Sequence, residues 1–168
     1  MEETFKAYVA GLFDGYGDVN IRRHKYNRVG GYVLVLELSF TTESAEVVEL
    51  LANTFGGVVN QTRRGFTYNI TRDSARALLI TIAPYVLTKK TRVRFALLVY
   101  ENYIATAQPG LRYVDDKEFA TIMSLLDHKG PINSYGKSGE FGERLKMLGI
   151  NPTAMLTPSQ DAEGEGPA

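Results

Sequence analysis

The chain has 168 residues, of which 44% are hydrophobic, a net charge of zero and no cysteine. This size and composition suit one folded domain with a hydrophobic core and a short appendage. The missing cysteines exclude disulfides, thiol catalysis and cysteine-ligated zinc. No apolar run reaches the roughly 18 residues of a membrane span. The acidic N-terminus lacks the basic region of a secretory signal, so we expect a cytoplasmic protein, or one associated with an organelle or nucleoid.

The zero net charge conceals an uneven distribution along the chain. Residues 1–112 carry 14 Lys and Arg against 10 Asp and Glu, whereas residues 113–168 carry 5 against 9. A mildly basic body with an acidic tail is compatible with nucleic-acid binding, although dedicated DNA-binding domains are usually more basic. Charge alone therefore does not separate a nucleic-acid-binding protein from a neutral interaction module.

The spacing of apolar residues predicts helices that alternate with pairs of strands. In chain order we expect a helix at 4–14 that Gly15 and Gly17 end, strands at 18–26 and 32–41, a helix at 44–55, a hairpin of strands 58–62 and 66–71, a helix that stops before Pro84, a long helix at 89–107 and a short helix at 115–126. Strand pairs separated by helices favour an α+β fold, with an antiparallel sheet and helices on one face.

The C-terminal part has a different composition. Glycines recur in a polar stretch, and the last residues are small and acidic. We therefore expect residues 1–126 to form the domain and 127–156 to form a loop-rich extension with one helical turn near 143–148. Residues 157–168 are predicted to be a disordered tail.

The end of the first predicted helix carries a run of small residues, in the sequence VAGLFDGYG at residues 9–17. Ala10, Gly11 and Gly15 lie toward one side of this helix, and the two glycines are four residues apart. Such spacing lets two helix backbones approach closely. The same side could instead seat the helix tightly on its own sheet.

This run, with the alternating strand after it and the order αββαββα over residues 4–83, resembles the motif and fold of the LAGLIDADG homing endonucleases. The resemblance implies an antiparallel sheet that forms a saddle, here followed by extra C-terminal helices. A single motif copy implies an intron-encoded type of protein that forms a homodimer on a long, near-palindromic site in double-stranded DNA. It also implies a dimer interface made by Ala10, Gly11, Asp14 and Gly15.

The resemblance further implies DNA cleavage that depends on Mg²⁺, bound by the last acidic residue of the motif. Tyr16 stands at that position, and a neutral phenol does not bind Mg²⁺ as a carboxylate does. The remaining candidates for the metal are the backbone of Gly15 and the carboxylate of Asp18. Lys89 matches a basic residue that would stabilise phosphate charge, although an ordinary solvated lysine at a helix start is the alternative.

In this family the sheet face away from the helices lies in the major groove. The resemblance therefore assigns DNA contacts to the outward strand residues and to the turns, namely Asn20, Arg22, His24, Lys25, Tyr26, Arg28, Glu37, Ser39, Asn60, Thr62, Arg63, Arg64, Thr67 and Asn69. Val33, Val35 and Thr71 share that face. Arg22 suits guanine, Glu37 suits cytosine, and the arginines of the hairpin turn suit phosphates. A solvated sheet face is the alternative interpretation.

Three functions remain open at this point. The first is a homing endonuclease with impaired cleavage. The second is an inactive descendant that binds nucleic acid, either as a maturase-like RNA-splicing cofactor or as a repressor. The third is a dimeric interaction module without nucleic acid. The residue that separates the first two is Tyr16.

Overall fold

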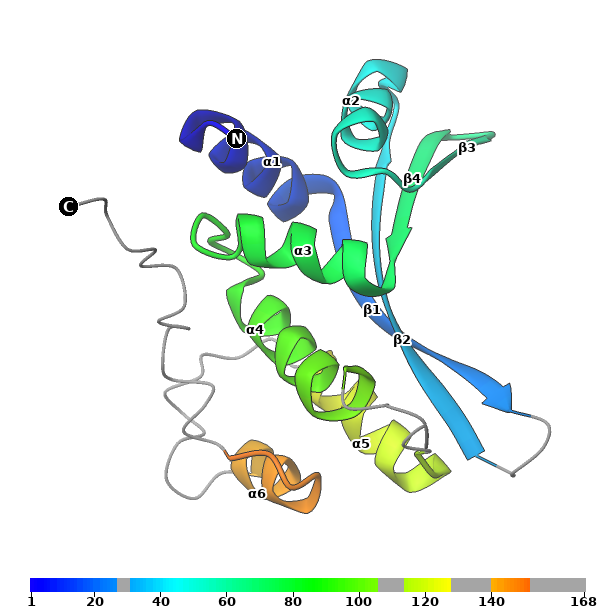
Figure 1. Cartoon of the computed structure of the whole chain (residues 1–168), viewed down its shortest axis with the longest axis vertical. Helices are drawn as coiled ribbons and strands as arrows, with labels where there is room; N and C mark the ends of the chain where they lie inside the picture. The colour runs from blue at the N-terminus through cyan, green and yellow to red at the C-terminus, as the bar shows by residue number, and fades with distance from the viewer. Residues whose placement is uncertain (27–30, 106–113, 128–139, 152–168) are drawn as a thin grey trace.

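The computed structural model describes residues 1–26, 31–105, 114–127 and 140–151. Its helices are α1 (Glu3–Tyr16), α2 (Ala45–Phe55), α3 (Arg72–Ile82), α4 (Lys90–Val99), the π-helical turn η1 (Tyr100–Ile104), α5 (Asp116–Leu126) and α6 (Glu140–Met147). Its strands are β1 (Gly17–Tyr26), β2 (Gly31–Thr42), β3 (Val58–Thr62) and β4 (Gly65–Thr71) (Figure 1). The predicted α+β class and αββαββα order are confirmed.

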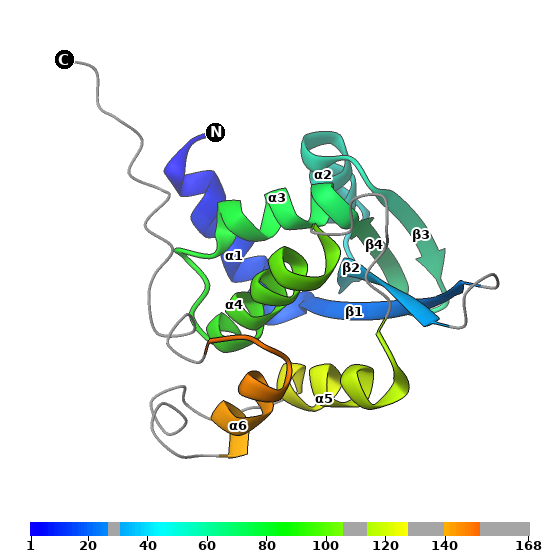
Figure 2. The same cartoon turned by 60° about the horizontal axis from the view of Figure 1, so that its bottom comes forward.

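The four strands form one antiparallel sheet in the order β1-β2-β4-β3. Strand β4 pairs with β2 only between Glu37 and Thr42, so the β1–β2 ribbon extends beyond the rest of the sheet. Helices α1, α2, α3 and α4 lie on one side of the sheet (Figure 1, Figure 2). We call the opposite side of the sheet the outer face.

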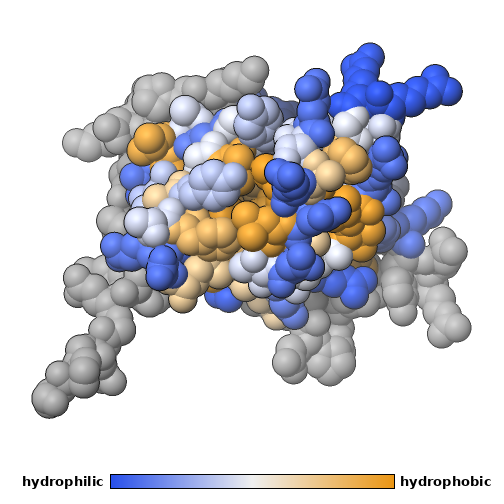
Figure 3. Space-filling view, turned by 90° about the horizontal axis from the view of Figure 1, so that it is seen from above, coloured by the Kyte–Doolittle hydropathy of each residue, from blue (hydrophilic) through white to orange (hydrophobic). Residues whose placement is uncertain are grey.

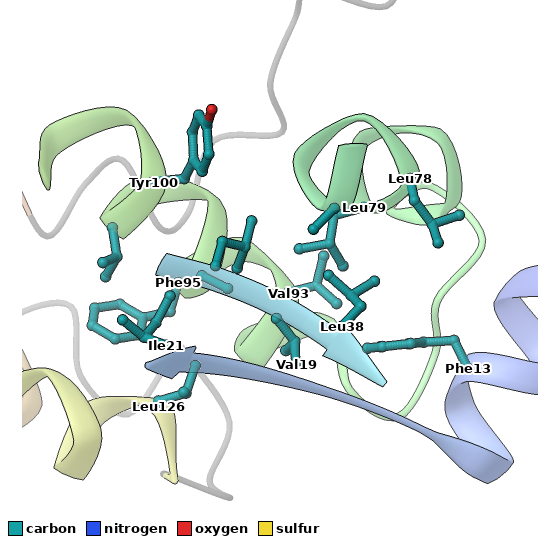
Figure 4. Close-up of a cluster of buried hydrophobic side chains, with 14 of the residues drawn as sticks. Phe13, Val19, Ile21, Leu38, Leu78, Leu79, Val93, Phe95, Tyr100 and Leu126 are labelled. Atoms are coloured by element: carbon teal, nitrogen blue, oxygen red, sulfur yellow. The ribbon is translucent and has the colours of Figure 1, made fainter. Parts of the chain in front are cut away.

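The core lies between the sheet and these helices. Alternate residues of the strands point inward, as the sequence predicts, and the buried ones are Val19, Ile21, Leu34, Leu36, Leu38, Phe40, Tyr68 and Ile70. Figure 4 shows Val19, Ile21 and Leu38 facing side chains of α3 and α4, among them Leu79 and Val93. Each such side chain stabilises the fold by roughly 1.5–3 kcal/mol through burial. No helix among the described residues combines the length and hydropathy of a membrane-spanning helix.

Helix α1 is longer than predicted. It ends at Tyr16, so Gly15 lies within the helix and does not end it. The prediction that Gly15 ends the helix is wrong: the N–H of Gly17 donates to the carbonyl of Phe13 in the regular helical pattern, and Lys89 donates to the same oxygen from outside the helix. Lys89 also donates to the carbonyl of Gly17, the C-cap residue, and so stabilises the end of the helix.

Helix α5 buries apolar side chains in the core, and it also contacts the β1–β2 ribbon through Arg23. Its guanidinium lies 4.2 Å from the ring centroid of Tyr32 and 4.7 Å from that of Phe119. It also forms an ion pair with Asp116, at 2.5 Å. Cation–π contacts of this kind stabilise by about 0.5–2 kcal/mol, so Arg23 adds to the stability of α5 beside the sheet.

The C-terminal extension contains more helix than the single turn expected. Helix α6 has 8 residues, and Leu145 and Leu148 are buried. The hydroxyl of Tyr103 donates to the carbonyl of Leu148, at 2.7 Å, and holds the end of this segment on η1. Tertiary burial stabilises a helix that a glycine-rich sequence does not favour. The predicted boundaries at 126 and 156 remain predictions, and residues 157–168 lie outside the described residues.

The hydroxyl of Tyr68 is buried without a hydrogen-bond partner in the described part of the chain, and burial raises the pKa of this phenol to about 12. A buried donor without a partner costs about 1–3 kcal/mol. We therefore expect Tyr68→Phe to raise the free energy of unfolding by about 1 kcal/mol, measured by urea denaturation. The control is Tyr103→Phe, which loses a buried hydrogen bond and should be destabilised. A destabilised Tyr68→Phe would show that the hydroxyl has a bonding partner.

Candidate nucleic-acid interface

The C-terminus of α1 and the N-terminus of α4 meet at Asp14. Its carboxylate accepts hydrogen bonds from the backbone N–H groups of Leu87 and Thr88, at 2.8 and 3.1 Å. It also accepts from the N–H of Lys89, at 3.1 Å, and from the Thr88 hydroxyl, at 2.7 Å. Burial opposes ionisation of this carboxyl, but these hydrogen bonds outweigh it and hold its pKa below the usual value.

This arrangement gives Asp14 a role within its own chain, and its assignment to the dimer interface remains a prediction. The carboxylate binds three backbone N–H groups of residues 87–89, the segment that leads into α4 in its own chain. A carboxylate at this end of a helix is also favoured by the helix dipole.

Lys89 forms the second half of the same junction. Its ammonium group donates to the carbonyl of Phe13, at 3.0 Å, and to the carbonyl of Gly17. It also lies 5.4 Å from the ring centroid of Phe13. Asp14 thus holds the segment that leads into α4 while Lys89 caps the end of α1, and we call this pair the reciprocal cap. The predicted contact of Lys89 with phosphate remains a prediction.

Arg92 of α4 covers the free edge of β1. Its Nε lies 3.2 Å from a carboxylate oxygen of Asp18 and donates to the carbonyl of Val19, at 3.0 Å. Its terminal nitrogens contact the amide oxygen of Asn20, at 3.2 Å, and the carboxylate of Asp127, at 3.3 Å. Sequence reasoning did not select Arg92, because its partners on β1 lie more than 70 residues away.

The residues at the end of α1 do not fit a magnesium site within one chain. Tyr16 is 59% exposed and offers a neutral phenol. Asp18 accepts hydrogen bonds from Val19 and Asn20 and pairs with Arg92, whose positive charge opposes a cation at the same oxygens. The described residues contain no group of three His, Cys, Asp or Glu side chains that could hold a metal. Asp18 and the backbone of Gly15 therefore do not make a metal site by themselves.

The exposed side of α1 is open and contains small residues. Gly11 and Gly15 are exposed, and a β-carbon added to either would have no atom within 4 Å. Tyr8 is 49% exposed, and Leu87, beside the end of the helix, is 83% exposed. Ala10 is fully buried in the core, so its assignment to a dimer interface is wrong: it lies on the inward side of the helix. Hydrophobic surface gathers at the end of the molecule where α1 and α2 lie (Figure 3).

The register of the sheet brings the predicted DNA-contacting strand residues together on the outer face. Asn20 lies opposite Glu37 in β1 and β2. Farther along, Ser39 pairs with Asn69, and Thr67 pairs with Asn60. The exposed or half-buried members of this surface are Asn20, Arg22, His24, Ser39, Asn60, Thr62, Thr67 and Asn69, with Arg63 and Arg64 exposed at the turn between β3 and β4.

Of the other four assigned residues, two do not fit the predicted contacts and two have side chains that the structure does not describe. Lys25 is exposed, but it is a strand residue of β1 whose alternation places it with Arg23 on the helix side of the ribbon, not in a turn. Glu37 was predicted to contact a base, but it is only 8% exposed and is not free to do so. Arg28 lies outside the described residues, as does the side chain of Tyr26.

No protein-family model matches the sequence, and no curated protein matches it significantly. Solved structures of homing endonucleases do match. The first is the homing endonuclease I-CvuI in complex with its target, to which this chain is 18% identical. The match covers 88% of this chain and 96% of I-CvuI, and the TM-score is 0.57. For the archaeal intron-encoded homing endonuclease I-Vdi141I complexed with DNA, the identity is 16%, the coverage 93% and 100%, and the TM-score 0.58.

A third structure is longer. The I-SmaMI LAGLIDADG homing endonuclease bound to cleaved DNA is 17% identical, with a TM-score of 0.50 over 84% of this chain but only 48% of that chain. At these identities the similarity is one of fold. It agrees with the observed order of elements and with the antiparallel sheet covered by helices on one side. The chain therefore has the fold of the LAGLIDADG homing endonucleases.

Proposed function

We propose that this protein binds double-stranded DNA as a homodimer at a long, near-palindromic site, and that its metal-dependent cleavage is impaired. The outer face carries the proposal, because all four strands contribute polar or basic side chains to one surface. Arginine, asparagine and threonine are the side chains that suit base edges and phosphates in a major groove. Similar structures are DNA complexes, which supports DNA binding by this chain.

The exposed side of α1 supports the homodimer. Its two open glycines leave space for a second helix backbone, and the exposed Tyr8, Tyr16 and Leu87 provide apolar surface around them. The chain covers 96% of I-CvuI but only 48% of I-SmaMI, so a single copy of this fold accounts for about half of the longer protein. Two copies related by a two-fold axis would bind two half-sites of opposite orientation.

The chemistry at the end of α1 supports impaired cleavage. Structures of I-CvuI were determined with Ca or Mg present. The motif resemblance assigns the position of the metal-binding acid to Tyr16, and Asp18 is paired with Arg92. These two observations also favour the second candidate, a nucleic-acid-binding protein without cleavage activity, which acts as a repressor or a maturase-like cofactor in RNA splicing.

The test of binding is selection of sites from a library of randomised DNA duplexes at fixed salt, with the purified full-length chain. We expect recovery of one near-palindromic sequence, with affinity that falls as salt rises because phosphate contacts release counterions. A structured RNA is the competitor, and preferential binding of RNA would favour the maturase-like function. Binding that does not depend on sequence would contradict the proposal.

The test of cleavage compares the natural chain with Tyr16→Asp on a supercoiled plasmid that carries the selected site, with Mg²⁺ or Mn²⁺. We expect binding without efficient nicking by the natural chain, and nicking at least about tenfold faster with the added carboxylate, a difference of about 1.4 kcal/mol in the barrier. Tyr16→Asn, which adds no charge, is the matched control.

Each outcome of this comparison has a distinct meaning. Efficient metal-dependent cleavage by the natural chain would contradict impaired cleavage and would make Asp18 the surrogate ligand. Cleavage by Tyr16→Asp alone would identify a DNA-binding protein that retains the rest of an endonuclease site. No cleavage by either, with DNA binding intact, would favour the non-cleaving function and point to Arg92 as a second obstacle.

A further inference from the structure

Glu37 is an unusual residue on the outer face. It lies on β2, between β1 and β4, and its cross-strand neighbours are Asn20 and Thr71. It is the polar residue that the described parts of the chain bury most, at 8% exposed, although it points away from the hydrophobic core. Burial of a carboxylate costs free energy unless a partner compensates its charge.

The compensating charge is Arg22. Its Nε lies 2.7 Å from a carboxylate oxygen of Glu37, and the side chains are 63% and 11% exposed, respectively. The guanidinium of Arg22 has no second residue as a partner in the described part of the chain. A buried carboxylate therefore pairs with an exposed arginine, with Nε as the contacting nitrogen.

An arginine that is paired at its Nε suits a bidentate contact with a base through its terminal nitrogens. Guanine presents two acceptors in the major groove, and the commonest specific contact to them is a fork of two arginine N–H groups. An arginine that is already held in one orientation loses less conformational freedom when it binds. On the outer face, the held arginine is also surrounded by other predicted DNA-contacting residues, including Asn20 and His24.

We propose that Glu37 is a positioning residue that fixes Arg22 for a bidentate contact with guanine, and that this pair sets the base preference at one position of each half-site. The inference rests on the proposed function, because it requires DNA in contact with the outer face. It replaces the direct contact of Glu37 with cytosine that the sequence suggests. The carboxylate acts through the arginine and does not touch the base.

The experiment measures binding of the full-length chain to the selected palindromic site and to every symmetric single-base replacement of it, at one salt concentration. Arg22→Ala should remove the preference for guanine at one position of each half-site, by about 10- to 100-fold. Glu37→Gln keeps the size of the side chain but removes its charge, and should lower the preference at the same position by about 5- to 10-fold. Combining Glu37→Gln with Arg22→Ala should produce no further loss at that position.

Two further variants separate positioning from general effects. Arg22→Lys keeps the positive charge near Glu37 but lacks the fork, so it should lose the same guanine preference and fold normally at an exposed position. Arg64→Ala, at the turn between β3 and β4, should weaken binding equally at all sites and reduce its salt dependence. A variant with damaged folding would lose affinity at every position instead of at one.

The outcomes distinguish the inference from the function on which it rests. If the natural chain shows no sequence-selective DNA binding, both the proposed function and this inference are wrong. If it binds selectively but Glu37→Gln leaves the preference unchanged, the inference alone is wrong. The same holds if Glu37→Gln and Arg22→Ala alter different positions of the site, or if Arg22→Lys retains the preference for guanine.

Discussion

Replacement of both Gly11 and Gly15 with alanine is expected to stabilise the isolated chain and to break the proposed dimer. Neither added β-carbon would have an atom within 4 Å in the chain itself. Alanine favours a helix by about 1 kcal/mol over glycine at an exposed position, so the monomer should gain about 1–2 kcal/mol of stability. Between two closely packed helices, however, the same methyl groups would force the backbones apart.

The effect on the dimer is expected to be large because each substitution occurs twice across a two-fold axis. Overpacking costs typically 1–3 kcal/mol per site, so the dissociation constant of the dimer should rise by roughly 100-fold or more. Analytical ultracentrifugation would measure this constant, and binding to the full palindrome would fall toward the affinity for one half-site.

The control for helix stability is Asn53→Ala, at an exposed position of α2. It should stabilise the chain by a few tenths of a kcal/mol and leave both the dimer and DNA binding unchanged. A Gly11→Ala, Gly15→Ala double variant that remains dimeric with unchanged affinity would show that α1 is not the interface.

Asp14→Ala is expected to be the most destabilising of the substitutions described. The carboxylate accepts four hydrogen bonds from residues 87–89, which lead into α4, three of them from backbone N–H groups. Loss of a helix cap costs about 0.5–2 kcal/mol, and hydrogen bonds to a charged group are the stronger kind. We expect a loss of about 2–3 kcal/mol, measured by denaturant unfolding at neutral pH.

The lowered pKa of Asp14 gives this contribution a defined dependence on pH. The ordinary value is 3.8, and the folded protein holds the carboxyl below it. The stabilisation is therefore present above the pKa of the unfolded chain and is lost as the pH falls through the lower pKa of the folded state. The difference in stability between the natural chain and Asp14→Asn should be constant from about pH 5 to 7 and should decrease below about pH 4.

Asp14→Asn is also the matched control for charge. Its amide oxygen still accepts one or two of the hydrogen bonds, so it should be less destabilised than Asp14→Ala. Equal stability of Asp14→Ala and the natural chain would contradict the role of Asp14 in holding the segment that leads into α4. If the difference in stability between the natural chain and Asp14→Asn does not decrease in acid, the lowered pKa of Asp14 is contradicted.

The order of elements was predictable because its signals are local. The alternation of Leu34, Leu36, Leu38 and Phe40 places one side of β2 in the core without reference to the rest of the chain. The glycines of α1 were recognisable from their spacing alone. Local spacing did not distinguish Ala10, which is buried, from Gly11, its exposed neighbour, because that difference depends on how the helix sits on the sheet.

The partners of the polar residues were not predictable in the same way. Asp14 meets the 87–89 segment across more than 70 residues of chain, and Arg92 meets β1 across a similar separation. No pattern within the motif reports such contacts. The burial of Glu37 likewise depends on its neighbours on other strands, including its ion-pair partner Arg22, which the sequence of β2 alone does not contain.

The junction between α1 and β1 has a consequence for how target sites can diverge. The helix ends at Tyr16 and the strand begins at Gly17, with no residue between them. A β-carbon at Gly17 would lie 2.8 Å from the α-carbon of Phe13, so this close approach requires glycine, and the reciprocal cap fastens both sides of it.

In the proposed dimer, this stiff junction separates the two-fold axis from the DNA-contacting strands. The backbone geometry of the junction then fixes the number of base pairs between the two half-sites. One inserted base pair would turn the two halves relative to each other by roughly 35°. Substitutions along the strands can change which bases are preferred, but new targets are expected to keep the ancestral spacing.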